Sequence, residues 1–500
     1  MNGLSCRRIG LVALAAGVVG AGWFVAMSAD TYRIGFPLDD AWIHQTYARN
    51  LAAAGEWAFT PGERSGGSTS PLWTVLLSVG HLVGLDPRVW AFTLGTVALV
   101  AAGSLGGLWL RNRSGSTGWV VLLGTLVLGL EWHLLWSSVS GMEVILVAAL
   151  VVAVIAATAR PGMRPEVIGF LIGLGIWIRP DAVTLIVIPG VVLLARSDRT
   201  IGTRATDLAR LALGVGLPLV VYLLFNLSSA GTIWPSTFYS KQTEYGALTA
   251  SPFLERFLRL AREPLIGPGL LLLPGAVFSV VDAARRRRWV NLAAATWASA
   301  YLLLYAVRLP VTYQHGRYQI PVVPIVLLLG WEGIGRLAAK APTPRLALLL
   351  KGWAAAVALT AIGFVGLGGR AYGLDVAIIE TEMVETAEWI ERNTQIEALI
   401  AAHDIGALGY FGGREVLDLA GLTDPEVIPI VRDEPALAGL LFRSGTDYLM
   451  TFPGWYPELT ACGNLVYTSE GRFSPAAGGE NMAVYRWPVV PAEGCMLYSP

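Results

Sequence analysis

The sequence predicts a polytopic α-helical membrane protein that carries a small α/β domain outside the membrane. Of its 500 residues, 54% are hydrophobic and only 14% are charged. Soluble globular proteins carry about 25% charged residues, so most of this chain is unsuited to contact with water. The formal net charge is zero, which gives no reason to expect a nucleic-acid partner. The first expected partner is the lipid bilayer.

Runs of about twenty apolar residues mark the candidate membrane spans. Eleven runs qualify, at residues 9–28, 89–110, 118–136, 143–159, 165–178, 181–195, 207–226, 264–281, 289–307, 319–337 and 345–368. A further apolar run at 71–85 has only fifteen residues and contains His81. Whether that run crosses the membrane decides the orientation of everything that follows it.

The distribution of arginine decides the topology, because cytoplasmic loops are enriched in Lys and Arg. Arg7 and Arg8 place the N-terminus in the cytoplasm. If 71–85 lies at the membrane surface or re-enters it, five later basic clusters also fall on the cytoplasmic side; these are 111–113, 160–164, 195–204, 285–288 and 336–345. We therefore predict eleven spans, with the N-terminus inside and the C-terminus outside.

The N-terminal run allows a second interpretation. Residues 26–29, AMSA, form a passable signal-peptide cleavage site, but the apolar run before them is longer than an ordinary signal sequence. We favour an uncleaved first span. The chain has only three lysines among its 36 basic residues, a bias typical of high-GC bacterial genomes, so the predicted location is a bacterial plasma (inner) membrane.

Two domains are expected. Residues 1–368 form the membrane domain, whose first outer loop covers 29–88 and includes an amphipathic helix at 39–57 lying on the surface. Residues 369–500 form a soluble extracytoplasmic α/β domain, with a helix at 384–393, a strand and turn at 398–411, and strands at 416–422 and 447–452. Cys462 and Cys495 fall in this exported domain, where a disulfide can persist; two unpaired buried thiols are the alternative.

With this topology, the ionisable residues at the outer face form a short set. Charges at the membrane edge are costly and are functional candidates by default. The set comprises Asp39, Asp40, His44, Glu143, Arg179, Asp181, Lys241, Arg308, His315 and Arg317.

The acids in this set also have structural interpretations. Asp39 or Asp40 would serve as the N-cap of the helix that follows, since Asp is favoured there. One cap needs only one carboxylate, so the doubled acid favours chemistry. Glu143 would be an acid favoured by the dipole at a helix N-terminus. Asp181 beside Arg179 is most simply a local ion pair at a helix break.

The cations and the histidine have structural interpretations as well. His44 lies one helical turn from Asp40 and is expected to orient or pack against it rather than react. Lys241 follows the aromatic loop WPSTFYS, and an interfacial lysine that extends its amine toward water is the alternative to a direct role. Arg317, in HGRY, would equally serve as an interfacial anchor.

The first outer loop resembles that of GT-C glycosyltransferases. The carrying stretch is LDDAWIHQTYARNLAAAGEWAFTPGERSGGSTSPLWT, and WSSVSGME (136–143), IRPDA (178–182), WPSTFYSK (234–241), HGRYQIPVVP (315–324) and HDIGALGYFGGREVLDLAGLTDPEV (403–427) follow in order. The resemblance is greatest to bacterial members similar to the mycobacterial terminal arabinofuranosyltransferase, which use decaprenyl phosphate in cell-wall biogenesis. Protein O-mannosyltransferases and the lipid A aminoarabinose transferase are more distant. Trp42 and GGSTSP depart from the usual pattern, so the resemblance does not carry over the sugar or the acceptor.

The resemblance implies a GT-C membrane enzyme that moves a sugar from a polyprenyl-phosphate donor to an envelope glycan or lipid-linked acceptor. The enzyme is expected to be a hexosyl- or pentosyltransferase that acts on the outer face. It implies an acidic pair on the first outer loop, a second acid after the third span, and cations near the donor phosphate. Interfacial helices in the first loop are also expected.

Glycosyl transfer of this kind needs a base, stabilisation of the leaving phosphate and exclusion of water. A desolvated carboxylate has a raised pKa and is a better base, so we assign that role to Asp39, with Asp40 as the alternative or as its support. Glu143 is expected to orient the acceptor or share the proton. Lys241 and Arg317, assisted by His315, would bind the donor phosphate. Supporting roles in the site are expected for five further residues, which are His44, Arg179, Asp181, Tyr239 and Tyr318.

The predicted reaction is a single displacement that inverts the anomeric centre. No phosphate-binding loop or dinucleotide fingerprint is present, so no cofactor is expected. A divalent metal ion at Asp39 and Asp40 is less favoured, because one acidic pair is weak evidence for it.

Two rival functions remain at this stage. A flippase or transporter for polyprenyl-linked sugars would use the same cations without a base, although transporters favour charges at mid-membrane and related halves. A membrane-anchored assembly protein would leave the first-loop acids unexplained.

Overall fold

The computed structural model describes residues 5–113 and 117–489. It divides into two compact units. The helical unit comprises residues 1–25, 92–222 and 248–370, and the mixed unit comprises 26–91, 223–247 and 371–500. The mixed unit therefore brings the first loop and a short segment around Lys241 together with the C-terminal segment.

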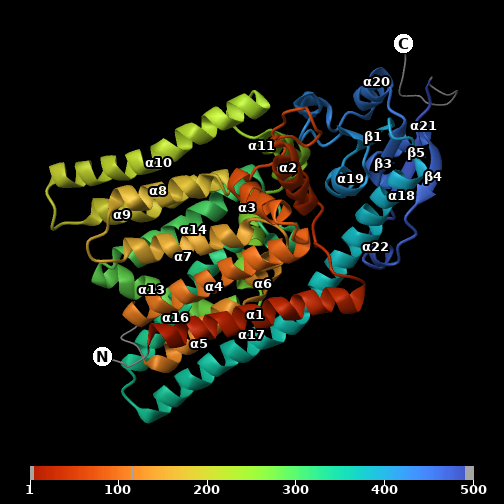
Figure 1. Cartoon of the computed structure of the whole chain (residues 1–500). Coiled ribbons are helices and arrows are strands. Elements are labelled where there is room, and N and C mark those ends of the chain that lie inside the picture. The colour runs from red at the N-terminus through yellow and green to blue at the C-terminus, as the bar shows by residue number, and fades with distance from the viewer. Residues whose placement is uncertain (1–4, 114–116, 490–500) are drawn as a thin grey trace. The chain divides into compact units, whose positions relative to one another are not determined.

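The helical unit is built from long apolar helices that run side by side (Figure 1). Four of its helices continue into residues of the mixed unit. Its elements are α1 (Cys6–Thr31), α4 (Pro87–Arg113), α5 (Gly118–Leu130), α6 (Trp132–Ser138), α7 (Val144–Thr158), α8 (Pro165–Ile176), η1 (Pro180–Ile186), α9 (Val187–Ala195), α10 (Ile201–Ala230), α12 (Phe253–Arg262), η3 (Glu263–Leu265), α13 (Pro268–Arg286), α14 (Trp289–Arg308), α15 (Tyr313–Gly316), η4 (Ile320–Val322), α16 (Val323–Ala339) and α17 (Pro344–Ile379).

Within the described residues, seven helices are long and apolar enough to cross a membrane, or eight if the bent pair α5 and α6 is one span. The predicted spans at 143–159, 165–178 and 181–195 correspond to the shorter apolar helices α7, α8 and η1–α9. The chain is thus a multi-pass membrane protein. The count of eleven spans and the orientation stay predictions.

Small residues allow α13 and α16 to pack closely. A Cβ at Gly333 would lie 2.0 Å from the carbonyl oxygen of Gly275, and a Cβ at Gly275 would lie 2.6 Å from that of Gly330. Small residues at helix interfaces of this kind let backbones approach in membrane proteins, where the hydrophobic effect does not drive helices together.

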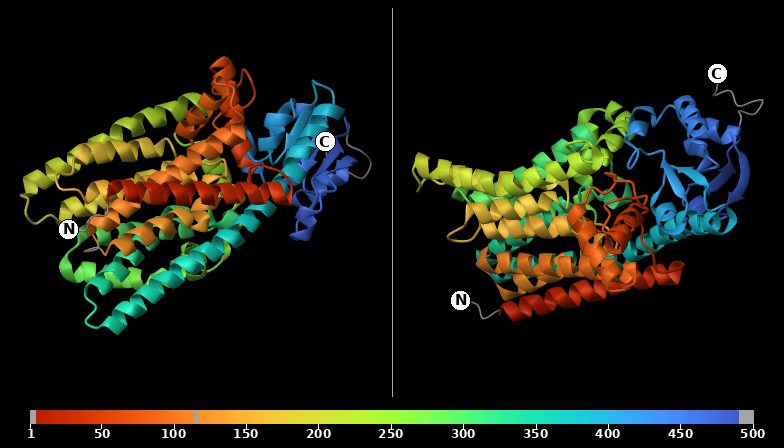
Figure 2. Two further views of the ribbon diagram at one scale, coloured as in Figure 1. Left: turned by 60° about the horizontal axis from the view of Figure 1, so that its bottom comes forward. Right: turned by 45° about the horizontal axis from the view of Figure 1, so that its top comes forward.

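The mixed unit contains a five-stranded sheet, drawn in blue (Figure 2), and shorter helices from three parts of the chain. Its helices are α2 (Asp40–Ala54), α3 (Pro71–Leu82), α11 (Ser236–Glu244), η2 (Gly246–Ala250), η5 (Glu380–Val384), α18 (Glu385–Asn393), α19 (Gly406–Phe411), η6 (Pro425–Ile430), α20 (Glu434–Ser444), η7 (Pro453–Trp455), α21 (Pro457–Cys462) and α22 (Phe473–Ala476). Its strands are β1 (Leu399–Ala402), β2 (Glu415–Asp418), β3 (Tyr448–Thr451), β4 (Asn464–Thr468) and β5 (Ala483–Arg486).

The strand order is β2-β1-β3-β5-β4. Strand β1 is parallel to both β2 and β3, whereas β5 is antiparallel to β3 and β4. Helices α19 and α20 connect the parallel strands, as such crossovers require. Leu437 and Leu441 of α20 pack with Leu449 of β3 in the core. The predicted small C-terminal domain with helix and strands is confirmed.

Two predicted helices of the first loop are present in the structure. Helix α2 forms where a helix is predicted, but nine of its fifteen residues are buried, including the polar side chains of His44, Gln45, Thr46 and Asn50. The polar side chains of this helix are enclosed because α3 and α19 pack against it, and its position at the membrane surface stays a prediction. The run at 71–85 forms α3, whose twelve residues extend about 18 Å, short of the roughly 30 Å of a bilayer core.

The predicted disulfide involves Cys495, which lies outside the described residues. Cys462 is buried at the end of α21. The pairing stays a prediction.

Candidate active site

The topology of the sheet identifies one place in the mixed unit where a ligand is expected. Strand β1 lies between β2 and β3 and runs parallel to both. The chain therefore continues from β1 to β2 on one side of β1 and returns to β3 on the other side. Open α/β sheets bind ligands beyond the carboxyl ends of strands at such a switch point. His403 and Asp404 come directly after β1, and the Nδ1 atom of His403 lies 2.7 Å from the Tyr456 hydroxyl in the segment after β3.

Asp39 lies against the segment that follows these residues. Its Oδ2 accepts a hydrogen bond of 2.7 Å from the Gly406 N–H, and its Oδ1 accepts one of 2.8 Å from the Ala407 N–H. Asp39 occupies the N-cap position of α2, and the structure describes every residue of that helix. The Asp39 side chain nevertheless makes no capping hydrogen bond to it. Asp39 therefore holds α19 rather than capping its own helix.

Gly406 makes this approach sterically possible. A Cβ at position 406 would lie 2.0 Å from the backbone oxygen of Asp39 and 2.7 Å from its Oδ2. Any side chain there would displace Asp39, so the contact requires glycine.

Asp39 and Asp404 form a buried acidic pair. Burial raises the pKa of Asp39 above its ordinary value, and the negative charge of Asp404 raises it further, against the lowering effect of the two backbone N–H groups. Burial also raises the pKa of Asp404, which His403 partly offsets. Within the described part of the chain, the buried Oδ2 of Asp404 has no hydrogen-bond partner. Buried like charges with raised pKa values are typical of functional sites.

Two ion pairs border this acidic pair. The Nζ of Lys241 in α11 lies 3.6 Å from Oδ2 of Asp40. The Nε2 of His403 lies 3.5 Å from Oε1 of Glu244 at the end of α11. Burial alone would lower the pKa of His403, but Glu244 and Asp404 raise it above its ordinary value. These two carboxylates therefore favour the protonated form of His403.

Two further predicted residues, His44 and Tyr239, also belong to the mixed unit. His44 is buried, with its Nδ1 atom 3.1 Å from the Ser68 hydroxyl and 3.4 Å from that of Thr74. Tyr239 is 36% exposed and packs edge-on against Phe238.

In the helical unit, Arg179 and Asp181 form the predicted ion pair. The Nη2 of Arg179 lies 3.0 Å from Oδ2 of Asp181, and its Nε lies 3.2 Å from Oδ1. The hydroxyls of Tyr301 and Tyr305 donate to the same Asp181 oxygen at 2.7 and 2.6 Å. Glu143 is buried at the start of α7, with Oε1 3.7 Å from Nη1 of Arg179. The local ion-pair interpretation is confirmed.

Arg317 and Tyr318 belong to the same neighbourhood. Arg317 is buried and donates to the Tyr318 hydroxyl at 3.0 Å. The guanidinium carbons of Arg179 and Arg317 lie 5.2 and 5.0 Å from the centroid of the Tyr318 ring, within the range of cation–π contacts. His315 has a left-handed backbone, with φ of 55°, and its ring lies edge-on to Trp132 and Trp136.

The structure thus groups the predicted residues into two clusters. Asp39, Asp40 and Lys241 lie in the mixed unit; Glu143, Arg179, Asp181, Arg317 and Tyr318 lie in the helical unit. His403, Asp404 and Glu244 are not among the site residues predicted from the sequence. The available signal was the His-Asp pair directly after a predicted strand, inside a stretch already noted for its resemblance.

Among the residues the structure describes, no group of three or more His, Cys, Asp or Glu side chains has an arrangement that would hold a metal ion. The expectation of a reaction without a cofactor stays a prediction.

Comparisons with known proteins place the fold. The structure is similar to that of ArnT from Cupriavidus metallidurans bound to undecaprenyl phosphate, with a TM-score of 0.59 and 15% identity over 98% of this chain and 99% of that one. The apo state of ArnT gives a TM-score of 0.60 and 17% identity over 98% of both chains. The apo oligosaccharyltransferase of Archaeoglobus fulgidus gives 0.58 and 12% identity over 88% of this chain and 69% of that one. The chain has the GT-C fold.

Sequence comparisons add little to this. Residues 376–485 match the model of a domain of unknown function (DUF8728). No curated protein matches the sequence. The predicted GT-C fold is therefore confirmed by structure rather than by sequence.

Proposed function

We propose that this protein is a membrane glycosyltransferase that uses a lipid-linked sugar donor. The observation that carries the proposal is the acidic pair of the first loop on a GT-C fold, with Asp39 fixed by two backbone N–H groups and Asp40 paired with Lys241. The similarity to ArnT bound to undecaprenyl phosphate supports a polyprenyl-phosphate donor. The candidate membrane spans support a donor whose lipid tail is held in the bilayer.

Asp39 is proposed as the general base that takes the proton from the acceptor hydroxyl. A base works best when its pKa lies near the working pH, and burial with Asp404 alongside raises the pKa of Asp39 toward that range. Its two backbone hydrogen bonds fix the carboxylate, which reduces the cost of positioning it for attack. Each oxygen still has a lone pair for the acceptor proton.

Asp40 and Lys241 are proposed as the donor-phosphate side of the reaction. Lys241 carries a compact cation suited to a phosphate, and Asp40 holds it in place at 3.6 Å. When the acceptor oxygen attacks the anomeric carbon, the bond to the lipid phosphate breaks and the phosphate takes the electron pair. Lys241 stabilises that charge. One displacement inverts the anomeric centre.

The finer assignments belong to the same proposal. The acceptor is an envelope glycan or glycolipid on the outer face, and the transferred sugar is a hexose or a pentose. Glu143, His315 and Arg317 are proposed to contribute to acceptor orientation and phosphate binding. These roles rest on the sequence resemblance. A variant of each of the three residues can be measured in the same transfer assay.

The proposal is tested with the purified full chain and polyprenyl-phosphate sugars of defined headgroup. Asp39→Asn is expected to lower the transfer rate by about 10²–10⁴-fold, the range for loss of a general base, while donor binding is retained. Lys241→Met is expected to weaken donor binding as well. Asp30→Asn, at an exposed acid near the end of α1, and Lys351→Met, at an exposed lysine, are the matched controls.

The outcomes separate the candidate functions. If the Asp39→Asn variant and the Asp40→Asn variant each transfer sugar at the wild-type rate, the first loop does not supply the base. Donor binding with movement of the lipid across vesicles, but no transfer by the wild-type protein with any acceptor, would instead indicate a flippase.

A further inference from the structure

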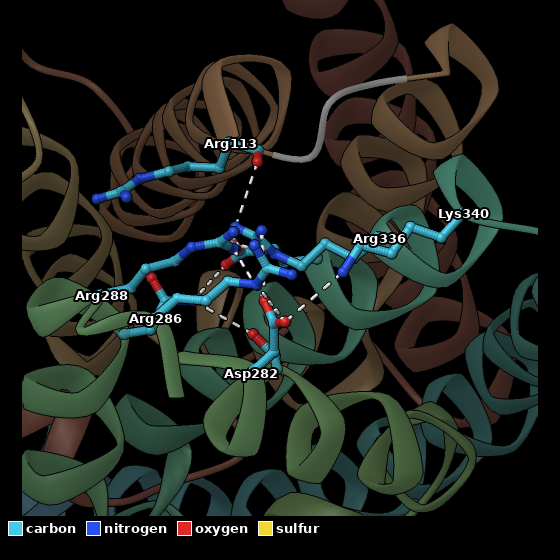
Figure 3. Close-up of polar contacts among 9 residues, drawn as sticks. Arg113, Asp282, Arg286, Arg288, Arg336 and Lys340 are labelled. Carbon is cyan, nitrogen blue, oxygen red and sulfur yellow. Dashed lines mark hydrogen bonds and ion pairs between the residues drawn. The ribbon is translucent and has the colours of Figure 1, made fainter. Parts of the chain in front are cut away.

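A second charged cluster lies in the helical unit, where α4, α13 and α16 end and α14 begins (Figure 3). It contains two carboxylates, Asp282 and Glu332, surrounded by a larger number of cations. The basic cluster, as we define it, comprises Arg285, Arg286, Arg287, Arg288, Arg336 and Lys340. None of these residues takes part in the proposed reaction.

The carboxylates order part of this cluster. Asp282 lies 2.8 Å from Arg286, 3.2 Å from Arg288 and 3.7 Å from Lys340. Glu332 pairs with Arg336, whose Nη2 also approaches the Arg113 carbonyl at 3.4 Å. Figure 3 shows Arg288 and Arg336 approaching Asp282 from different parts of the chain.

The cluster holds more positive charge than these carboxylates balance. The six cations of the cluster outnumber its two acids, and Arg285, Arg286 and Arg287 are all exposed. The backbone at Arg287 is left-handed, with φ of 56°, which ends α13 and turns the chain into α14 within two residues. The tight turn holds the four consecutive arginines together at one end of the helix pair.

An apolar groove begins beside this turn. It has a volume of about 400 Å³ and is lined by Val280 of α13 and by Leu292, Ala295, Thr296, Ser299, Ala300 and Leu303 of α14. From Leu292 to Leu303 the groove follows α14 for about 17 Å. That length is close to half of the roughly 30 Å hydrocarbon thickness of a bilayer.

We propose that the groove and the basic cluster together bind one anionic phospholipid of the leaflet on this side. The phosphate headgroup would contact the exposed arginines of the turn, and an acyl chain would lie in the groove. Charge complementarity selects an anionic over a zwitterionic lipid, since each Lys or Arg near a membrane surface adds about 1 kcal/mol of attraction. The sequence places these arginines on the cytoplasmic side, which makes this an inner-leaflet site.

The test is native mass spectrometry of the delipidated full chain titrated with dioleoyl phosphatidylglycerol or dioleoyl phosphatidylcholine. The wild type is expected to retain phosphatidylglycerol preferentially. The double variant R285Q/R287Q removes charges that do not order the Asp282 network, and should reduce that preference roughly fivefold per arginine. The control R160Q/R164Q removes two exposed arginines of another predicted cytoplasmic loop that does not line the groove. Because the delipidated sample contains no bilayer surface, this control should leave the preference unchanged.

A second pair of variants tests the groove with the charges intact. Ala300→Trp fills the groove and is expected to weaken phosphatidylglycerol binding several-fold, whereas Ala355→Trp, at an exposed alanine of α17, should not. Equal retention of both lipids by the wild type overturns the proposal, as does equal loss in both arginine variants. Preferential displacement of phosphatidylglycerol by undecaprenyl phosphate overturns the choice of a phospholipid. A change in oligomeric mass in Ala300→Trp without loss of lipid would indicate that another helix occupies the groove, and would also overturn it.

Discussion

The cluster around Asp39 and the cluster around Asp181 both bury carboxylates, but they neutralise them differently. Asp181 faces Arg179 at 3.0 Å and accepts from two tyrosine hydroxyls. Asp39 instead has a second acid, Asp404, as a neighbour. The two hydrogen bonds that fix its carboxylate come from backbone N–H groups. A buried acid destabilises the folded state least when it is fully paired. A buried acid beside a like charge lowers stability, so a requirement for stability does not explain its presence. The difference favours a structural role for Asp181 and a chemical one for Asp39.

The largest expected effect separates the clusters by stability. Asp181→Asn leaves the buried Arg179 without its main counter-charge, and should lower the free energy of unfolding by roughly 3–5 kcal/mol. Asp39→Asn should change it by about 1 kcal/mol or less, because the loss of one hydrogen bond is offset by relief of repulsion from Asp404. Thermal or denaturant unfolding in detergent measures both, with Asp198→Asn at an exposed site as control. Equal destabilisation by the two variants would remove the distinction.

The next effect tests whether α19 positions Asp39. Gly406→Ala introduces a Cβ at 2.0 Å from the Asp39 carbonyl oxygen, so Asp39 must shift. A 1 Å misplacement of a reacting group can cost about 10²-fold in rate, and we expect a loss of that order in the transfer assay. Gly246→Ala, where no atom lies within 4 Å of the new Cβ, should retain the wild-type rate. If both variants retain it, the contact with α19 has no catalytic consequence.

The smallest effect concerns the pH dependence of transfer. A base must be deprotonated, so the rate should rise with pH through the pKa of Asp39, which lies above its ordinary value. Asp404→Asn removes a negative charge that raises this pKa, and the rising limb should move to lower pH. The measurement is kcat/KM against pH for both proteins, with Glu426→Gln at an exposed acid as control. A shift to higher pH, or none, would contradict the coupling between Asp39 and Asp404.

Parts of the candidate site could be predicted because their signal is local. The doubled acid after an apolar run, the Arg179–Asp181 pair two residues apart, and the lysine after an aromatic loop each stand in one short stretch. The contribution of His403, Asp404 and Glu244 could not be found in that way. Glu244 and His403 are 159 positions apart, and only the folded chain brings the segment after β1 against α11 and the first loop.

The sequence by itself determined that this is a multi-pass membrane protein with a small mixed domain, because apolar runs and alternating patterns follow from the solvent each segment must meet. It also located the acidic pair and the existence of the helix at 40–54. Only the tertiary structure decided that this helix is enclosed, that Asp39 binds α19 rather than capping α2, and that Asp404 lies beside it. Burial and like-charge proximity arise from contacts between distant segments, and no local pattern in the chain encodes them.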